Sequence, residues 1–376
     1  MSSSGLVDSW RLGAARRPRG PPRDRGSSPA VPCLLLSLLL GPSAWLSGCH
    51  LSQAVVGGID VLVSGTPLDV AMVEDPDPGV RRLLYEVTRA KRFAAVMGLK
   101  PTSSYESFVG VAGPAVVWVV AGCEPSSFNP KVWSFPVVGS FSYRAWFDRQ
   151  RALEDADEIA KEGYEVWVRG ASAYSTLGFF SDPVLSTMLD PGEPSGLGDL
   201  ANVILHESVH ATVYVGGQSP FDESLASFVA DVLTERYLGA SYGDGSSELQ
   251  AWRVAEAARE SRRGAIRAAH ETLTEVFTST ASDDEKRARK TEVFDRLEVL
   301  LGRRLNNAAI LQLDTYETGR GPFSELLAEC RRIPALLEWV RAIEPRHFSG
   351  AHDADIGAAL TRLRDEQGPC RRRGTY

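Results

Sequence analysis

The chain has 376 residues, enough for one large domain or two modest ones, and its composition is that of an ordinary globular protein: 43% hydrophobic, 24% charged and 9% aromatic. The formal net charge of −7 argues against general nucleic-acid binding, which needs a basic surface.

The first 48 residues predict a secretory signal that is not part of the fold. Residues 1–30 are basic and poor in apolar side chains, and the apolar run 31–45 is too short to span a bilayer as a helix. The run ends in Leu46-Ser47-Gly48-Cys49, which resembles the bacterial lipobox. This resemblance implies cleavage before Cys49 and lipidation of its sulfur. A simple signal peptide or a buried apolar strand is the alternative.

Two further expectations concern this leader. His50 follows the cysteine where an aspartate would retain a lipoprotein in the inner membrane, so the same resemblance implies an outer-membrane anchor facing the periplasm. The stretch before the apolar run is long for a signal, which suggests that translation starts further downstream.

Of the remaining cysteines, Cys123, Cys330 and Cys370 can form at most one disulfide among themselves.

Strands and helices alternate in the first part of the mature chain. Apolar spacing predicts a helix over 81–97 and another over 151–162, ending at Gly163. Runs of β-branched and alternating residues predict strands over 115–120 and 164–170, and a strand or extended loop over 135–143.

The second part of the mature chain is predicted to be nearly all helix. The segments 248–272 and 283–301 are long, charged and amphipathic, which is typical of the solvated outer helices of a packed core. The stretch 364–376 is polar and basic and is expected to fray. We therefore expect an α+β, predominantly helical fold, with a single domain over 49–350 and a C-terminal end over 351–376.

The motif H-E-x-x-H occurs once, at His206-Glu207-Ser208-Val209-His210. On a helix, positions i and i+4 share a face, so both imidazoles can bind one Zn²⁺ ion. Glu207 can then contact the attacking water as a general base. Asp199 is the expected N-cap of this helix, and Gly216-Gly217 its expected end. A pair of ordinary histidines on an amphipathic helix is the alternative.

Glu223 is the candidate for the third ligand of this zinc site. It lies 13 residues after His210, where it opens a second predicted helix. Two histidines, one glutamate and one open position are the ligand set of hydrolytic zinc sites. Spacing alone leaves open that Glu223 is an ordinary first-turn glutamate facing the helix dipole.

A hydrolase of this kind also needs a donor for the developing oxyanion. Tyr174 is the candidate, because its segment directly precedes the metal helix, and Tyr143, Tyr214 and Tyr316 are alternatives. The segment 171–180 could be an edge strand that pairs with an extended peptide, or an ordinary packed strand.

With these motifs in place, the chain resembles a family of bacterial lipoproteins described as putative aminopeptidases, over roughly residues 49–345. The resemblance implies a gluzincin-like zinc peptidase in which Glu223 is the third ligand. We expect asparagine, tryptophan and leucine in this family where Asp222, Phe179 and Ser208 stand. The blocks that carry the resemblance are 93–95 with Leu99, 104–105, 117–118, 133–137, Gly139, 143–144, 173–189, 205–210, 221–228, 305–308 and 315–316.

Three functions remain open at this stage. The first is a zinc aminopeptidase at the cell envelope, which needs an anionic pocket for the free α-amine, and no G-x-M-E-N-type block supplies one. The second is an envelope endopeptidase of the same mechanism, acting on peptides or proteins. The third is a non-catalytic lipoprotein held together by zinc, which the presence of Glu207 disfavours because a structural site needs no general base.

Overall fold

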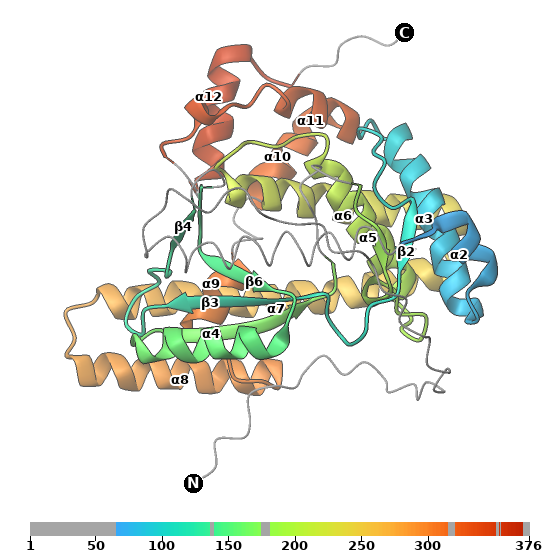
Figure 1. Ribbon diagram of the computed structural model, residues 1–376. Helices are drawn as coiled ribbons and strands as arrows, with labels where there is room; N and C mark the ends of the chain where they lie inside the picture. Colours follow the sequence, from blue (N-terminus) through green and yellow to red (C-terminus); the bar gives the residue numbers. More distant parts are fainter. Residues whose placement is uncertain are drawn as a thin grey trace, which may run out of the picture.

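The computed structural model describes residues 65–135, 139–173, 181–314, 320–350, 353 and 355–370. It has the α+β, mainly helical architecture that the sequence predicts, with strands confined to the first half (Figure 1). The leader 1–48 and Cys49 lie outside the described residues.

The first-half elements are β1 (Thr66–Pro67), α2 (Leu68–Glu74), α3 (Pro78–Val96), β2 (Ser107–Val109), β3 (Val117–Cys123), β4 (Trp133–Phe135), β5 (Gly139–Phe141), β6 (Tyr143–Trp146), α4 (Arg149–Lys161), β7 (Glu165–Ala171) and β8 (Val184–Leu185). The second-half helices are α5 (Gly196–His210), α6 (Ser219–Tyr242), α7 (Ser247–Thr278), α8 (Asp283–Leu301), α9 (Asn307–Asp314), α10 (Arg320–Cys330), α11 (Ile333–Val340) and α12 (Ile356–Gln367).

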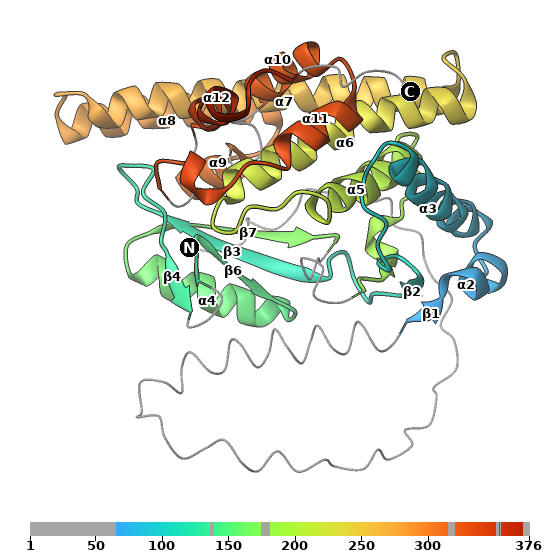
Figure 2. The same ribbon diagram turned by 90° about the horizontal axis from the view of Figure 1, so that it is seen from above.

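An antiparallel sheet in the order β6-β3-β7 forms the strand layer. In the central strand, Val120 is opposite Arg144 on one side and Val168 on the other. Helix α4 covers one face of this sheet and α9 packs on the other (Figure 2). Because β3 is buried from both sides, its sequence is a continuous apolar run rather than an alternating one. The strand predictions over 115–120 and 164–170 are thus confirmed as β3 and β7.

A second, smaller sheet leads the chain into the metal helix. Its order is β1-β2-β8, and β8 runs parallel to β2 with Phe108 opposite Val184. A short 3₁₀ turn, Ser186–Met188, separates β8 from the loop before α5. Val184 and Leu185 are fully buried in the same core cluster as Leu200 and Ile204 of α5, so the strand and the helix share one core.

Helices α5 and α6 form the centre of the helical half. Leu205 and Val209 of α5 pack with Leu225 and Val229 of α6 in one core cluster, and all four side chains are fully buried. Helices α10, α11 and α12 contribute many of the other members of this cluster. Both ligand-bearing helices are therefore anchored through apolar contacts on the side away from the polar residues.

The structure corrects both predicted ends of the metal helix. Helix α5 begins at Gly196, and its N-cap is Ser195 rather than Asp199. Gly196 is required there, because a Cβ would lie 2.1 Å from the backbone oxygen of Asp190. The helix ends at His210 and not at Gly216-Gly217, so Tyr214 falls in the connection to α6.

The long amphipathic segments form α7 and α8, which pack against each other through an apolar stripe. The C-terminal end differs from the expectation of a tail that frays from residue 364. Helix α12 continues to Gln367, and Cys370 forms a disulfide with Cys330 of α10. Residues 371–376 lie outside the described residues.

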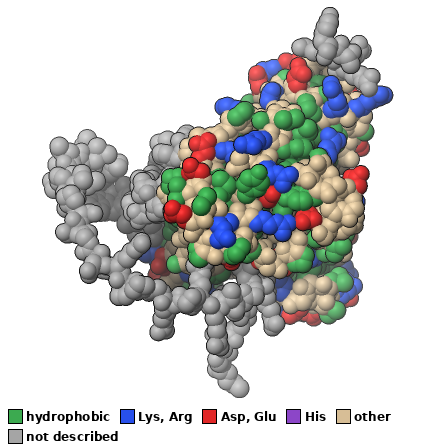
Figure 3. All heavy atoms as spheres, turned by 90° about the vertical axis from the view of Figure 1, so that its right-hand side faces the viewer, with side chains coloured by type: hydrophobic (Ala, Val, Ile, Leu, Met, Phe, Trp, Pro, Cys, Tyr) green, Lys and Arg blue, Asp and Glu red, His purple; other side chains and the backbone are tan. Residues whose placement is uncertain are grey.

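No described helix combines the length and apolarity that a membrane-spanning segment needs. The face that carries α2 and α3 mixes basic and hydrophobic side chains (Figure 3). The exposed hydrophobic residues of these two helices include Val73, Tyr85 and Val96, and the side chain of Arg82 in α3 is 58% exposed.

Candidate metal centre

Three polar side chains from α5 and α6 converge on one point. The Nε2 atoms of His206 and His210 are 3.1 Å apart. Glu223 places one carboxylate oxygen 3.3 Å from Nε2 of His206 and the other 3.7 Å from Nε2 of His210. All three ligand atoms lie within 4.8 Å of one another. The structure thus brings together the three residues that the sequence singles out.

Local structure explains this convergence. The four-residue spacing puts both histidines on one face of the last turn of α5. The chain then turns through residues 211–218, and Gly217 takes a φ of +80°, a value that L side chains rarely adopt. Helix α6 starts at Ser219 with Pro220 in its first turn, so Glu223 faces the histidines from that helix's beginning.

The separations fit a tetrahedral zinc ion. Zinc binds imidazole nitrogen and carboxylate oxygen at about 2.0–2.2 Å, which separates neighbouring ligand atoms by about 3.3 Å. The three separations, 3.1, 3.3 and 3.7 Å, lie around this value, and the two from Glu223 end on its two different oxygens. The donor set of two imidazoles and one carboxylate is also that of hydrolytic zinc sites. These residues therefore fit zinc in both distance and chemistry.

Electrostatics keep the carboxylate of Glu223 ionised. Burial by itself would raise its pKa, but the hydrogen bonds and charges of His206 and His210 lower the pKa to about 2. The pKa of His210 moves the other way. Burial would lower it, whereas the hydrogen bond and charge of Glu223, followed by the charges of Glu207 and Asp222, raise it. Without a metal the site thus attracts positive charge.

Glu207 lies beside this group but is not a member of it. Its carboxylate is near enough to raise the pKa of His210, yet the cluster of ligand atoms comprises only His206, His210 and Glu223 among the described residues. A position next to the ligands without coordination is what a general base requires.

Asp222 occupies a buried position behind the ligands. Its Oδ1 accepts a hydrogen bond of 2.8 Å from the backbone N–H of Val215. Burial raises its pKa to about 7, although Val215 and the charge of His210 act in the opposite direction. In the described part of the chain, Oδ2 of Asp222 and Nδ1 of His210 are buried without a hydrogen-bond partner. The charge of Asp222 is also one of the causes that raise the pKa of His210.

Of the four tyrosines that the sequence offers as oxyanion donors, two lie within the described residues. Tyr174 and Tyr316 lie outside the described residues. Tyr143 is in β6, opposite Ala121 of β3, and is 41% exposed. Tyr214 lies in the connection between α5 and α6 and is 54% exposed; partial burial, followed by the charges of Asp222 and Glu223, raises its pKa.

The charge of Glu207 also reaches a tyrosine that is not one of these four. Tyr105 is buried, and the charge of Glu207 is one of the causes that raise its pKa. The only sequence signal for it was the short block 104–105 in the family resemblance. No motif or periodicity links Tyr105 to a helix that begins about 90 residues later, at Gly196.

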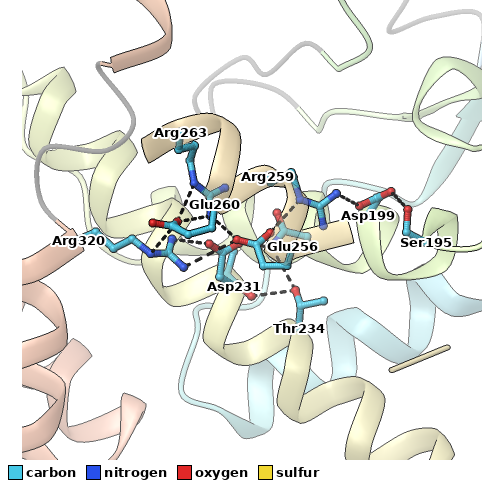
Figure 4. Close-up of polar contacts among 11 residues, drawn as sticks. Ser195, Asp199, Asp231, Thr234, Glu256, Arg259, Glu260, Arg263 and Arg320 are labelled. Atoms are coloured by element: carbon cyan, nitrogen blue, oxygen red, sulfur yellow. Dashed lines mark hydrogen bonds and ion pairs between the residues drawn. The ribbon is translucent and has the colours of Figure 1, made fainter. Parts of the chain in front are cut away.

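A polar network holds α5 against α6, α7 and α10 on another side (Figure 4). Arg259 of α7 forms an ion pair of 2.9 Å with Asp199 of α5, and Arg320 of α10 forms one of 2.6 Å with Asp231 of α6. Asn202 of α5 donates to the same Asp231 at 3.0 Å. The network therefore ties α5 and α6 to each other and to α7 and α10.

The comparison with known protein families decides the classification. The model of a family described as "Putative aminopeptidase" matches residues 49–347. The chain belongs to this family. No curated protein and no solved structure matches it. The match covers β1 to α11 and includes the metal centre, but it ends before α12 and Cys370.

Proposed function

We propose that this protein is a zinc-dependent peptidase of gluzincin type, an aminopeptidase that acts at the bacterial cell envelope. The observation that carries the proposal is the convergence of His206, His210 and Glu223 within 4.8 Å, with Glu207 beside them. The family description supports the peptidase assignment. In this proposal the three clustered residues hold the ion.

Zinc in such a site polarises the scissile carbonyl and lowers the pKa of the attacking water. The remaining chemistry belongs to the chain. Glu207 takes a proton from the water as it attacks the carbonyl carbon, and passes it to the nitrogen of the leaving amine when the C–N bond breaks. Glu223, as a carboxylate ligand, would stay deprotonated while the ion is bound.

The disulfide supports the proposed location. Disulfides persist in the periplasm and outside the cell and are rare in the reducing cytosol. A covalent Cys330–Cys370 bond therefore suits a protein exported by the leader 1–48 and anchored through Cys49.

The decisive experiment pairs cleavage with metal analysis. Purified protein from residue 50 onward is incubated with a mixed peptide library, with and without a chelator, and zinc is quantified by mass spectrometry. We expect one zinc per chain and chelator-sensitive cleavage. Glu207→Gln should retain zinc but lose about 10²–10⁴-fold in rate, the usual contribution of a general base.

Two results would count against the proposal. If Glu207→Gln cleaves peptides as fast as the parent, Glu207 is not the base. If neither protein cleaves any peptide while zinc is bound, the protein is the non-catalytic, zinc-stabilised lipoprotein instead. Peptides with free and acetylated N-termini separate the two peptidase classes, because an aminopeptidase requires the free amine and an endopeptidase does not.

A further inference from the structure

The outward face of helix α3 combines basic and apolar side chains. Tyr85 and Val96 on this face are 57% and 75% exposed, and the side chain of Arg82 is 58% exposed. Arg92 is exposed as well. The helix contains a single acidic residue, Glu86, which is buried and adds no negative charge to the outward face. Figure 3 shows the side of the molecule on which this face lies.

Helical spacing aligns these side chains. Positions 82, 85, 89, 92 and 96 follow one another by three or four residues, so they form one stripe over about four turns. The other side of the helix packs into the core through Leu83, Leu84 and Val87. The stripe therefore cannot turn inward, and it presents guanidinium groups together with a phenol ring and a valine to the outside. We call Arg82, Tyr85, Arg92 and Val96 the α3 face.

The positive charge of the α3 face is little compensated. Arg82 forms an ion pair of 2.8 Å with Glu248 of α7, but exposed pairs of this kind contribute little. Two further cations follow the C-terminal end of the helix. Lys100 is exposed, and Arg341 of the segment after α11 donates to the backbone oxygen of Gly98 at 3.1 Å.

The acidic residues of the same region lie elsewhere. They are on α2 and in the turn that leads into α3, namely Asp69, Glu74, Asp75 and Asp77. The positive charge is therefore greatest toward the C-terminal end of α3. A basic surface of this kind stands out in a chain with a formal net charge of −7.

The α3 face also lies near the place where the described chain begins. Gly65 is directly followed by β1 and α2, and both views show β1 and α2 beside α3 (Figures 1 and 2). Residues 50–64 connect Gly65 to Cys49, the proposed site of lipidation, and a segment of this length spans at most about 50 Å. An anchor at Cys49 would thus keep this side of the protein close to the bilayer.

We infer that the α3 face rests on a phospholipid surface with anionic headgroups. Arg82 and Arg92 attract the headgroup phosphates, while Tyr85 and Val96 enter the interfacial layer, where amphipathic rings and short apolar groups are favoured. An acidic protein surface would satisfy the arginines but not the exposed apolar groups, and the position of Cys49 favours a bilayer. Because so small a surface binds weakly by itself, it orients the anchored protein rather than holding it. This inference does not depend on the zinc chemistry.

The test uses protein from residue 50 onward, which retains every described residue and lacks Cys49, so an attached lipid cannot cause binding. Sedimentation with vesicles measures its partition coefficient. We expect binding to phosphatidylcholine vesicles that contain one-third phosphatidylglycerol, and much weaker binding to pure phosphatidylcholine. Binding to the anionic vesicles should fall steeply at about 1 M salt, where the Debye length is about 3 Å.

The double variant Arg82→Gln/Arg92→Gln should lower partition into the anionic vesicles about 30-fold, because each basic residue near such a surface contributes about fivefold. The matched control is Arg287→Gln/Arg296→Gln on α8, which lies far from α3 in both views (Figures 1 and 2). Its two side chains are 69% and 64% exposed, and the net charge changes equally. The control should bind like the parent.

A second pair of variants tests the apolar part. Tyr85→Ser/Val96→Ser should weaken binding at low and at high salt, because it removes no charge. Val299→Ser/Leu300→Ser is the control at the end of α8, where these residues are 85% and 71% exposed, and it should bind like the parent. Urea unfolding of all four variants checks that each is folded.

Three results would overturn the inference: no binding of the parent to anionic vesicles, equal loss in the two arginine variants, or equal loss in the two apolar variants. In the first case the α3 face would suit an acidic protein instead. Peptide cleavage by the same preparations is a separate readout. Protein that cleaves peptides but ignores vesicles refutes this inference alone, and protein that binds vesicles without cleaving refutes only the proposed function.

Discussion

The carboxylate of Asp222 accepts a hydrogen bond of 2.8 Å from the backbone N–H of Val215. Asp222, which directly precedes Glu223, therefore holds the segment that connects the two histidines to α6. This bond spans the turn between α5 and α6. It uses only one oxygen of Asp222, and the other is buried without a partner among the described residues. An asparagine, which we expect in the family at this position, could accept the same bond without the buried charge.

The first prediction follows from that charge. Asp222 has a folded-state pKa of about 7, raised above its ordinary 3.8 by burial, so the folded protein binds more protons than the unfolded one between these values. Stability of the metal-free protein should therefore fall as pH rises from about 4 to about 7 on account of this group. Asp222→Asn lacks this contribution and should be more stable at pH 8, by at most about 4 kcal/mol.

The measurement is urea unfolding of metal-free parent and Asp222→Asn between pH 4 and pH 8. The difference between the two should be small at pH 4 and should grow with pH, with the variant the more stable. Curves that stay parallel over this range would show that Asp222 does not carry a raised pKa.

The second prediction concerns Glu223, whose carboxylate faces both histidines. A neutral amide is a poor zinc ligand, so Glu223→Gln should lose most of its zinc together with peptide cleavage. Glu235→Gln is the matched control on the same helix, because Glu235 is 51% exposed and pairs only with Arg253 among the described residues. Zinc stoichiometry after dialysis checks both variants. If Glu223→Gln keeps zinc and activity, the third ligand is another residue, and Asp222 is the first to test.

Local periodicity explains why so much of this architecture could be predicted. The helices over 81–97 and 151–162 and the strands over 115–120 and 164–170 appear as α3, α4, β3 and β7, with ends shifted by a few residues. The two histidines lie on one face of α5 because a spacing of four residues has the same consequence in any helix.

Features that depend on contacts between distant segments could not be predicted in this way. Aspartate is a good N-cap, so the local sequence favours a start of α5 at Asp199. The helix instead begins at Gly196, where the backbone of Asp190 approaches too closely for any side chain. The position of Tyr105 depends on a loop anchored at Asp182 and Thr212, which no local pattern reveals. The odd number of cysteines left the pairing of Cys330 open for the same reason.

The third prediction concerns the Cys330–Cys370 disulfide, which closes a loop with a sequence separation of 40. Constraining a loop of this size in the unfolded state stabilises a protein by about 3–4 kcal/mol. The double variant Cys330→Ser/Cys370→Ser should lose about that much free energy of unfolding. A reductant should destabilise the parent and leave the double variant unchanged. Cys123→Ala, which removes a buried free thiol, should remain sensitive to the reductant, and equal insensitivity in all three proteins would argue against the bond.

The last prediction is membrane attachment through Cys49, expected from the lipobox Leu46-Ser47-Gly48-Cys49. Attachment of this kind should depend on the lipid that the sulfur of Cys49 carries. A single acyl chain binds only weakly, so a lipoprotein-type anchor with several chains is needed for stable attachment. Cys49→Ser should abolish labelling with a radioactive fatty acid and release the protein from the membrane fraction. Cys33→Ser is the matched control within the leader and should keep both labelling and attachment.

Labelling that persists in Cys49→Ser would show that the leader does not direct lipidation at this cysteine, and the protein would then be secreted by a simple signal peptide.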